Sequence, residues 1–447
     1  MKKILLLVLL FNYLVSQSED ATLTIYKDGT ALIKQPVGWS VPLGLSYITW
    51  NSLPNGIDRD TPFLNIRGVD ILSQRFNNNI FKGNDFFNGL RGQLVQVKPK
   101  SSKLIKGTLL EISSNSITLD HSSGIISFNR SEIEFLGSKI ENTDSPIFTP
   151  FLSWDLKSKS AQDVEGELVY KSNNFTWTTV YRLIMQNEEK GELIAEAVIS
   201  NASDMSFETA KIQLVEGNLN KVKIKTPTPE RMSRTFAVSK SEVPSLMSSD
   251  ALGDYYIYSL NNEHDLGAKE NITIRMYGPL DIGYTKKYVF ENSERRQKEE
   301  PLEVQLSMNN TESNGLGISL PGGKVEMYSF KQGRGLEYIG ADNMGQVPKG
   351  QSTTLTSGRA FDVIGNRKVL NYDRQRKSEE AVIEIRVTNA RNEDVDVLLI
   401  EHINGDWVIK DESLNYQKKD ASTIQFPLTL NAGETQSVYY TYRKEWK

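Results

Sequence analysis

Three histidines are the first candidates for chemistry, because the chain of 447 residues contains no cysteine. His121 lies in Leu-Asp-His-Ser-Ser-Gly, His264 in Asn-Asn-Glu-His-Asp, and His402 in Glu-His-Ile-Asn-Gly. A Ser-His-Asp hydrolase needs a histidine held by an acid against an activated serine. The chain lacks the Gly-x-Ser-x-Gly turn that exposes such a serine. The three contexts are a hairpin turn, a polar loop and a strand end, so we expect solvated or locally hydrogen-bonded histidines.

Metal chemistry is limited by the same composition. Without cysteine there are no disulfides, no thiol catalysis and no thiolate metal sites. The His-x-x-x-His spacing typical of zinc sites is also missing. Two loops, residues 55–60 and 392–396, are rich in oxygen ligands. Neither matches a full calcium-binding template, so we expect ordinary turns, no metal and no cofactor.

Carboxylates and glycines single out no site. Glycoside hydrolysis requires a facing pair of carboxylates, but acidic residues occur throughout the chain and no spacing distinguishes a pair. Gly322-Gly323-Lys324 and Gly333-Arg334-Gly335 lack the strand–loop–helix context of a phosphate cradle, which favours plain turns. We therefore assign no catalytic, cofactor-binding or metal residue.

Six tryptophans raise the alternative of a sugar-stacking platform. A platform requires two or three of them to be exposed on one face, whereas most lie in alternating strands, where burial in a core is the commoner role. The six residues are Trp39, Trp50, Trp154, Trp177, Trp407 and Trp446.

Residues 168–217 show most clearly what kind of fold positions these side chains. Phe175, Trp177, Tyr181 and Leu183 alternate with more polar residues, which is the period of a strand with one buried face. Closely spaced polar turns follow, and the segment is predicted to form four consecutive antiparallel strands. Similar strands continue before and after it, so we predict an all-β protein made of antiparallel β-sandwiches, with Trp177 and Tyr181 in the core.

Composition narrows the class of protein. Apolar residues make up 38% and charged residues 24% of the chain, and the net charge is −4. These values are typical of globular domains. The two signs of charge are interspersed, so there is no electrostatic footprint for nucleic acid or an acidic membrane.

The first residues resemble an export signal. Lys2 and Lys3 precede an apolar run that extends to Val15, and small residues follow it. We predict a signal peptide over residues 1–18, a buried N-terminal helix being the alternative. No second long apolar run follows, so we expect no integral membrane span after signal removal and a periplasmic or secreted protein.

The remaining chain is predicted to contain four regions. Residues 19–85 form an N-terminal β-strand region, either a small domain or strands that complete a later sandwich. Residues 88–138 form a small Sm/SH3-like β-barrel, preceded by a loop over residues 77–88. Residues 147–291 form a β-sandwich with a mobile loop at 225–254, whose prolines and serines show no alternation. Residues 301–447 form a C-terminal β-sandwich, and the charged run 292–301 is either the boundary or a polar strand end.

One internal similarity connects the two sandwiches. Residues 194–203 (IAEAVISNAS) and 382–391 (VIEIRVTNAR) both contain an alternating strand, then Asn-Ala, then a polar turn. An asparagine at this place can hydrogen-bond the backbone of the turn. We hypothesise that both sandwiches are built on a related hairpin, chance similarity being the alternative. Different strand positions within the two sheets would contradict the hypothesis.

Several segments carry a resemblance to a known family. The central ones are Leu168-Val-Tyr170, Phe175-Thr-Trp177 with Tyr181, Ala197-Val-Ile-Ser-Asn201 and Ala210-Lys-Ile-Gln-Leu-Val-Glu-Gly217. Later ones are Tyr255-Tyr-Ile-Tyr-Ser-Leu260, Gly315-Leu-Gly317 with Leu320-Pro-Gly-Gly323, and Gly358-Arg-Ala-Phe-Asp-Val363. Together they resemble the bacterial domain of unknown function 4139 family, over roughly residue 151 to the C-terminus. Many members carry a coiled coil in the N-terminal half, where this chain has the barrel-like segment. The resemblance implies an exported two-sandwich protein and no established activity.

We therefore expect an exported, non-catalytic β-sandwich protein with a structural or binding role in the cell envelope or outside the cell. Its partner is an unidentified protein or glycan, not nucleic acid, and its contacts are expected at loops and sheet edges. The alternative is a carboxylate-dependent hydrolase that acts on envelope or extracellular glycans. A deep pocket with two facing acids would favour the hydrolase, and a flat surface with a bare apolar edge would favour binding.

Overall fold

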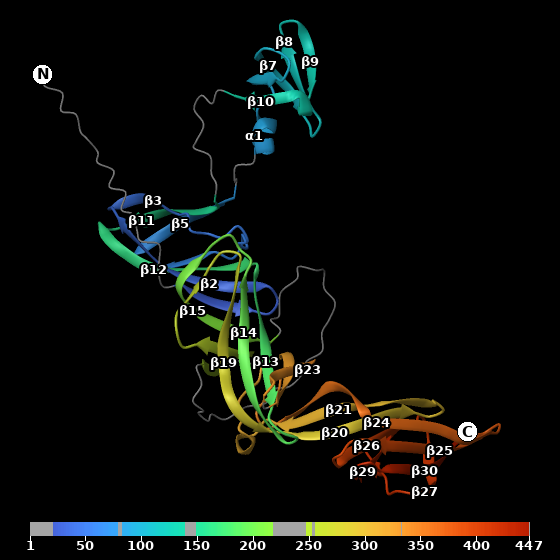
Figure 1. Ribbon diagram of the computed structural model, residues 1–447. Coiled ribbons are helices and arrows are strands. Elements are labelled where there is room, and N and C mark those ends of the chain that lie inside the picture. Colours follow the sequence, from blue (N-terminus) through green and yellow to red (C-terminus); the bar gives the residue numbers. More distant parts are fainter. Residues whose placement is uncertain are drawn as a thin grey trace, which may run out of the picture. The chain divides into compact units, whose positions relative to one another are not determined.

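The computed structural model describes residues 21–78, 83–138, 149–217, 247–252, 255–331 and 333–446 (Figure 1). Nearly all of its regular structure is β, which confirms the predicted all-β class. The chain forms two compact units. Unit 1 contains Leu32–Asn173 and Ser203–Glu208, and unit 2 contains Thr22–Ala31, Asn174–Ala202 and Thr209–Lys447. The predicted signal peptide lies outside the described residues, and no described helix is long and apolar enough to cross a bilayer.

Unit 1 is built around a two-layered sandwich. One layer contains β2 (Thr30–Val41), β12 (Gln162–Asn173) and β4 (Phe63–Ile66) as neighbours, and the other has the order β3 (Gly44–Trp50), β11 (Phe151–Ser158), β5 (Val69–Asn77). Trp39 of the first layer packs against Trp50 and Trp154 of the second, at ring-centroid distances of 6.2 and 5.9 Å. The strands of region 19–85 thus do not form a domain of their own. They pair with strands after residue 150, because both halves are amphipathic and need each other to bury one face.

Where the sequence predicted an Sm/SH3-like barrel, a five-stranded half-barrel sheet is inserted between β5 and β11. The sheet has the order β10 (Ile133–Gly137), β6 (Leu94–Pro99), β7 (Ile105–Ile112), β8 (Ser116–His121), β9 (Gly124–Asn129). Gly107 allows β8 to approach β7 closely, because a Cβ there would lie 2.7 Å from the carbonyl oxygen of Asp120. The expected loop at 77–88 instead contains a short helix, α1 (Gly83–Gly89). Its Phe87 packs on the barrel core, so tertiary packing stabilises a helix whose sequence alone predicts none.

Unit 2 begins with a second sandwich. One sheet has the order β19 (Glu270–Gly283), β14 (Lys190–Asn201), β13 (Phe175–Met185), β22 (Gly323–Lys331), β23 (Gly335–Met344), and Figure 1 shows β13, β14 and β19 side by side. The facing strands are β1 (Thr22–Tyr26), β15 (Phe207–Glu216), β17 (Tyr255–Leu260) and β16 (Met247–Leu252), with β18 (His264–Leu266) beside β15. Trp177 and Tyr181 of β13 are fully buried, as predicted.

The predicted four-stranded run at 168–217 is wrong as a single sheet. Only β13 and β14 are antiparallel neighbours, while β12 and β15 both belong to a different sheet. β13 pairs in parallel with β22, and β15 pairs in parallel with β1. Alternation reveals which face of a strand is buried, but parallel partners far away in the sequence leave no local signal.

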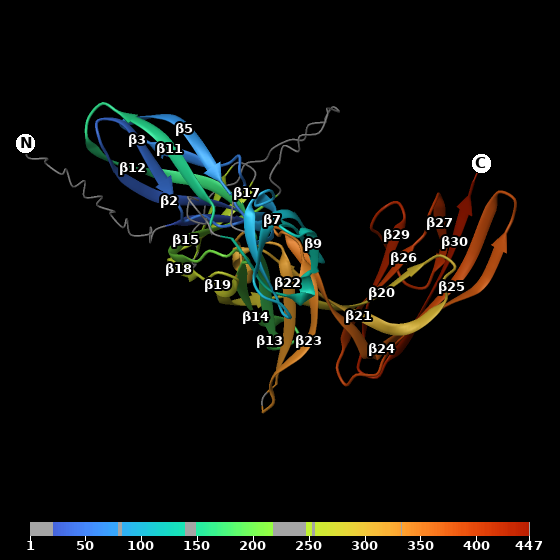
Figure 2. The ribbon, with the colours of Figure 1, turned by 90° about the horizontal axis from the view of Figure 1, so that it is seen from above.

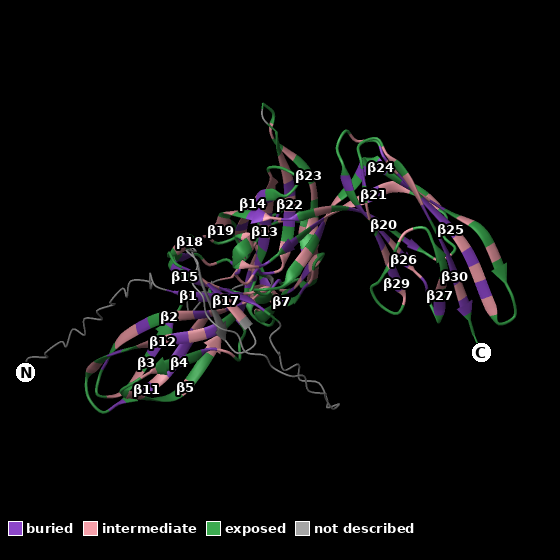
Figure 3. Ribbon diagram, turned by 90° about the horizontal axis from the view of Figure 1, so that it is seen from below, coloured by how far each residue is buried: buried purple, intermediate pink, exposed green. Residues whose placement is uncertain are grey.

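The C-terminal sandwich of unit 2 contains nine strands in one continuous hydrogen-bonded order (Figure 2). They are β27 (Trp407–Glu412), β30 (Thr435–Glu445), β25 (Ser378–Asn389), β24 (Ser352–Arg374), β21 (Lys298–Asn309), β20 (Thr285–Ser293), β26 (Val395–His402), β29 (Thr423–Leu430) and β28 (Gln417–Lys418). Buried and partly buried residues alternate along β14 and along most of β25 (Figure 3). The charged run 292–301 is the β20–β21 turn with the strand ends beside it, so it is a polar strand end and not a boundary. The β22–β23 hairpin was predicted to belong to the C-terminal sandwich. It instead joins the first sandwich of unit 2, where β22 pairs with β13.

The two sandwiches of unit 2 share one topology. β14 lies between β13 and β19 and leads to β15, which runs parallel to β1. In the same way β25 lies between β24 and β30 and leads to β26, which runs parallel to β20. The buried Asn201 donates to carbonyl oxygens in the turn before β19, and the buried Asn389 donates to carbonyl oxygens in the turn before β30. Those turns read Leu-Gly-Ala-Lys-Glu and Leu-Asn-Ala-Gly-Glu. The strand positions therefore agree with the hypothesis of a repeated hairpin.

The predicted loop at 225–254 lies mostly outside the described residues. Its described part, Met247–Leu252, forms β16, which pairs antiparallel with β17. The structure differs here from the expected irregular segment, because backbone pairing with β17 forms a strand where side-chain alternation is weak.

Candidate functional site

The three histidines lie on three different strands, β8, β18 and β26. His402 contacts Glu291 through Nε2 at 2.6 Å and Thr423 Oγ1 through Nδ1 at 3.1 Å. The hydroxyl of Thr423 is buried while Glu291 is exposed, the reverse of a triad, in which the nucleophile faces the substrate. His121 contacts Ser123 within its hairpin turn at 2.8 Å. Burial lowers the pKa of His264, and the nearby Asp265 opposes that shift only in part.

The carboxyl groups with a shifted pKa do not have the raised pKa of a glycosidase acid. Where the pKa of a carboxyl group departs from its ordinary value in the described part of the chain, it is lowered: Asp155, Glu294, Glu300, Glu326, Glu384 and Asp420. Hydrogen bonds from lysine, arginine, hydroxyl or backbone donors cause these shifts. A glycosidase acid needs the opposite, a raised pKa that keeps its proton at neutral pH.

The two oxygen-rich loops have partners within the protein. Asp204 accepts from the backbone N–H of Asn55 at 3.0 Å, and Asp394 accepts from that of Ala432 at 2.9 Å. Across the described ranges, no three histidine or acidic side chains gather to hold a metal ion.

The tryptophans do not form an exposed platform. All six lie within described residues: Trp50, Trp154, Trp177 and Trp407 are buried, Trp39 is half-buried against two of them, and Trp446 is exposed on its own near the C-terminus. The structure therefore supports packing in the core as the role of most of the tryptophans.

Residues of the family-like segments meet at one end of the first sandwich of unit 2. Glu216, the last residue of β15, forms an ion pair with Lys27, which directly follows β1. Lys27 Nζ also donates to the carbonyl oxygen of Gly322 at 2.6 Å and lies 4.6 Å from the ring centroid of Trp177. Gln346 donates to the other carboxylate oxygen of Glu216 at 2.7 Å. Lys27 was not singled out in the sequence, although a lysine ending an apolar strand was visible there.

Two buried aromatic residues extend this cluster. The Tyr181 hydroxyl donates to the carbonyl oxygen of Pro321 at 2.7 Å, and Trp177 Nε1 donates to that of Val215 at 3.2 Å. Burial raises the pKa of Tyr181 well above its ordinary value, so the hydroxyl keeps its proton. The polar groups satisfy one another and tie residues 319–323 to the sandwich. We interpret the cluster as a structural closure.

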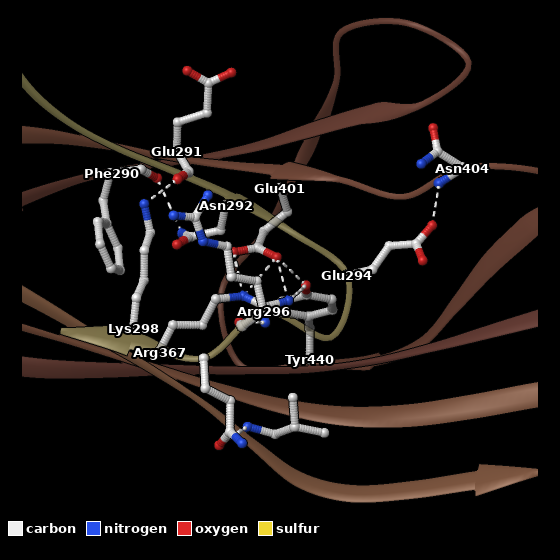
Figure 4. Close-up of polar contacts among 12 residues, drawn as sticks. Phe290, Glu291, Asn292, Glu294, Arg296, Lys298, Arg367, Glu401, Asn404 and Tyr440 are labelled. Carbon is white, nitrogen blue, oxygen red and sulfur yellow. Dashed lines mark hydrogen bonds and ion pairs between the residues drawn. The ribbon is translucent and has the colours of Figure 1, made fainter.

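The C-terminal sandwich buries a second charged network (Figure 4). Arg367 and Glu401 are fully buried and joined by hydrogen bonds of 2.8 to 3.1 Å. The Tyr440 hydroxyl donates to Glu401, and Arg367 also donates to the backbone carbonyl of Arg296 in the β20–β21 turn. Burial alone would lower the pKa of Arg367, but its attraction to Glu401 outweighs burial and raises it.

Glu216 and Glu401 occupy equivalent places in the repeated topology. Glu216 follows the buried apolar residues of β15, which is parallel to β1, and Glu401 follows those of β26, which is parallel to β20. The basic partners of the two glutamates are not equivalent: Lys27 follows β1, and Arg367 lies in β24. Short-range patterns could not reveal this pairing, because the partners of Glu216 and Glu401 are distant in the sequence.

A different kind of surface lies on the three-stranded sheet of unit 1. Strand β3 is an edge strand and pairs with β11 alone among the described strands. Its outward side chains include Leu45, which is 73% exposed, and Tyr47, which is 58% exposed. β3 has no charged residue, no proline and no bulge in its register. The opposite edge, β5, carries Asp70 and Arg75 and pairs through a register shift, which are devices that protect an edge.

A scan against protein-family models finds no match, and a search of curated proteins finds none either. The resemblance to the family of domain of unknown function 4139 therefore stays a prediction.

Proposed function

We propose that the protein is an exported, non-catalytic binding protein that acts in the cell envelope or outside the cell. In this proposal its open strand β3 pairs with an extended segment of a partner protein. The main support is the unprotected edge of β3 beside exposed apolar side chains. Strand addition uses such an edge, because main-chain hydrogen bonds supply affinity and alternate side chains supply specificity.

The chemistry of the partner follows from the strand. Leu45 and Tyr47 project from one face at a spacing of two residues, so an extended partner with apolar residues at alternating positions would pack against them. The absence of charge on β3 favours a segment that is itself uncharged. A glycan partner at this surface is disfavoured, because neither of the two exposed side chains is a tryptophan.

The hydrolase alternative has weaker support. Its acid would need a raised pKa, whereas the shifted carboxyl groups of the described residues are all lowered. The exposed Glu291 and the buried Thr423 around His402 are likewise in the wrong arrangement for nucleophilic attack.

The test compares two equally exposed apolar residues. Leu45→Lys places a charge on the open edge of β3, and Ile125→Lys places the same charge on β9, where the side chain is 72% exposed. The full chain is used to capture proteins from the native envelope or culture fluid after cross-linking. We expect Leu45→Lys to reduce capture at least tenfold and Ile125→Lys to leave it unchanged. Equal capture by both variants, or no capture by the wild type, would refute the proposal.

Export is tested separately. We expect the protein recovered outside the cytoplasm to lack about the first 18 residues, as for a cleaved signal peptide. Mass spectrometry of the intact protein measures this, and a full-length cytoplasmic product would contradict the predicted location.

A further inference from the structure

A polar cavity of about 290 Å³ lies in the C-terminal sandwich, next to the buried network of Arg367 and Glu401. Its walls come from the β20 strand, the β20–β21 turn, and strands β21, β24 and β26. The cavity is half open to solvent and is large enough for a small polar ligand. The strand addition proposed for β3 does not involve this cavity.

One wall of the cavity contains an unsatisfied acceptor. Asn292 is 3% exposed, and its Nδ2 donates to the carbonyl oxygen of Phe290 at 3.2 Å. Its Oδ1 is buried and has no hydrogen-bond partner among the described residues. Buried polar atoms are almost always satisfied, so each exception calls for an explanation. A hydroxyl or N–H group of a ligand in the cavity would supply the missing donor.

The charges of the cavity leave one cation without a partner. Lys298 pairs with Glu300, and Arg359 pairs with Glu300 and Glu303 at 3.1 and 3.2 Å. His402 contacts Glu291 at 2.6 Å. Each acidic side chain that lines the cavity, Glu291, Glu300 and Glu303, is therefore already paired.

The remaining cation is Arg296. Its exposed guanidinium forms no ion pair or hydrogen bond with any described residue, and Figure 4 shows its side chain extending from the turn towards Asn292. The cavity therefore combines a free guanidinium with an unsatisfied acceptor.

Hydrogen bonds fix the backbone of the β20–β21 turn that carries Arg296. Arg367 donates to the carbonyl oxygen of Arg296, and Arg367 is itself held by Glu401 and Tyr440. On the far side of the turn, the backbone N–H of Asn404 donates to the carboxylate of Glu294 at 2.9 Å. The position of Arg296 is thus set by the fold, while its side chain stays available. Preorganisation of this kind lowers the entropic cost of binding.

We propose that this cavity binds an acidic saccharide unit, with its carboxylate on Arg296 and one of its hydroxyl groups donating to Asn292 Oδ1. A guanidinium binds a carboxylate through two parallel hydrogen bonds. A simple carboxylate such as acetate has no donor for Asn292, and a neutral sugar leaves Arg296 unpaired, whereas a uronic acid fits both groups. The site is independent of the strand addition proposed for β3, since it lies in unit 2.

Calorimetry on the full chain tests the proposal with the disaccharide of galacturonic acid, the matching neutral disaccharide, and acetate. We expect saturable binding of the acidic disaccharide and at least tenfold weaker binding of the other two. Arg296→Gln should weaken binding of the acidic disaccharide at least tenfold, and Arg296→Lys less, because lysine keeps the charge but not the paired donors. Both replacements affect an exposed side chain, so folding should be unchanged.

Arg334→Gln is the matched control, since Arg334 is an exposed arginine on the turn between β22 and β23, away from the cavity. Its affinity should equal that of the wild type. The inference is overturned if the acidic disaccharide does not bind, if Arg296→Gln binds it as the wild type does, or if acetate binds equally well. Failure here leaves the capture experiment on Leu45 unaffected, so the two proposals are separable.

Discussion

Glu401→Gln tests how much the buried ion pair depends on charge. The substitution keeps the size and an acceptor oxygen of the side chain, but it leaves the guanidinium of Arg367 fully buried without a counter-charge. Removing one partner of a buried pair typically costs about 3–5 kcal/mol. We expect a loss in that range, because neither side chain has any exposed surface through which water could compensate.

The assay is urea unfolding followed by circular dichroism, with the free energy of unfolding extrapolated to water. Glu445→Gln is the control: it removes an exposed partner of Arg443 and should change stability by less than about 0.5 kcal/mol. The double variant Arg367→Met with Glu401→Gln should recover most of the loss, because no charge then remains buried. A loss below about 1 kcal/mol for Glu401→Gln, or no recovery in the double variant, would refute this reasoning.

Two further predictions concern a close backbone contact and an acid titration. Gly323→Ala should destabilise the protein by about 1–3 kcal/mol, because its Cβ would lie 2.3 Å from the carbonyl oxygen of Thr179, whereas Gly345→Ala meets nothing within 4 Å and should be neutral in thermal unfolding. The hydrogen bond from Lys298 holds the pKa of Glu300 below 4.5, so its stabilising effect is present above pH 4.5 and is lost as pH falls through the lower folded-state pKa. The stability difference between wild type and Glu300→Gln should therefore shrink below pH 4.5, and a difference that grows on acidification would contradict this.

The sequence predicted strands and buried faces well, but not partners. The alternation around Trp177 and Tyr181 correctly identified a buried strand face, because side-chain periodicity depends only on local geometry. It could not show that β12 and β15 leave the sheet of β13, or that β22 returns to it. The charged run 292–301 fitted both a domain boundary and a polar strand end, because a linker and a hairpin tip are both solvated.

The candidate sites were predicted less well than the fold, for a related reason. Lys27 with Glu216, and Arg367 with Glu401, are brought together only by tertiary pairing. Asn201 and Asn389 were correctly marked by their shared Asn-Ala motif. The matching Leu-x-Ala-x-Glu turns were present in the sequence as well, and a search for a second repeated element would have found them.

The return of β22 to β13 also sets an order for folding during synthesis. β13 ends at Met185 and its partner begins at Gly323, so more than a hundred residues must be made in between. At roughly 5–20 residues per second, one edge of β13 stays uncovered for on the order of ten seconds. Such an edge is open to wrong pairing with other chains. Chaperone protection of the nascent chain should therefore matter most between these two points of synthesis.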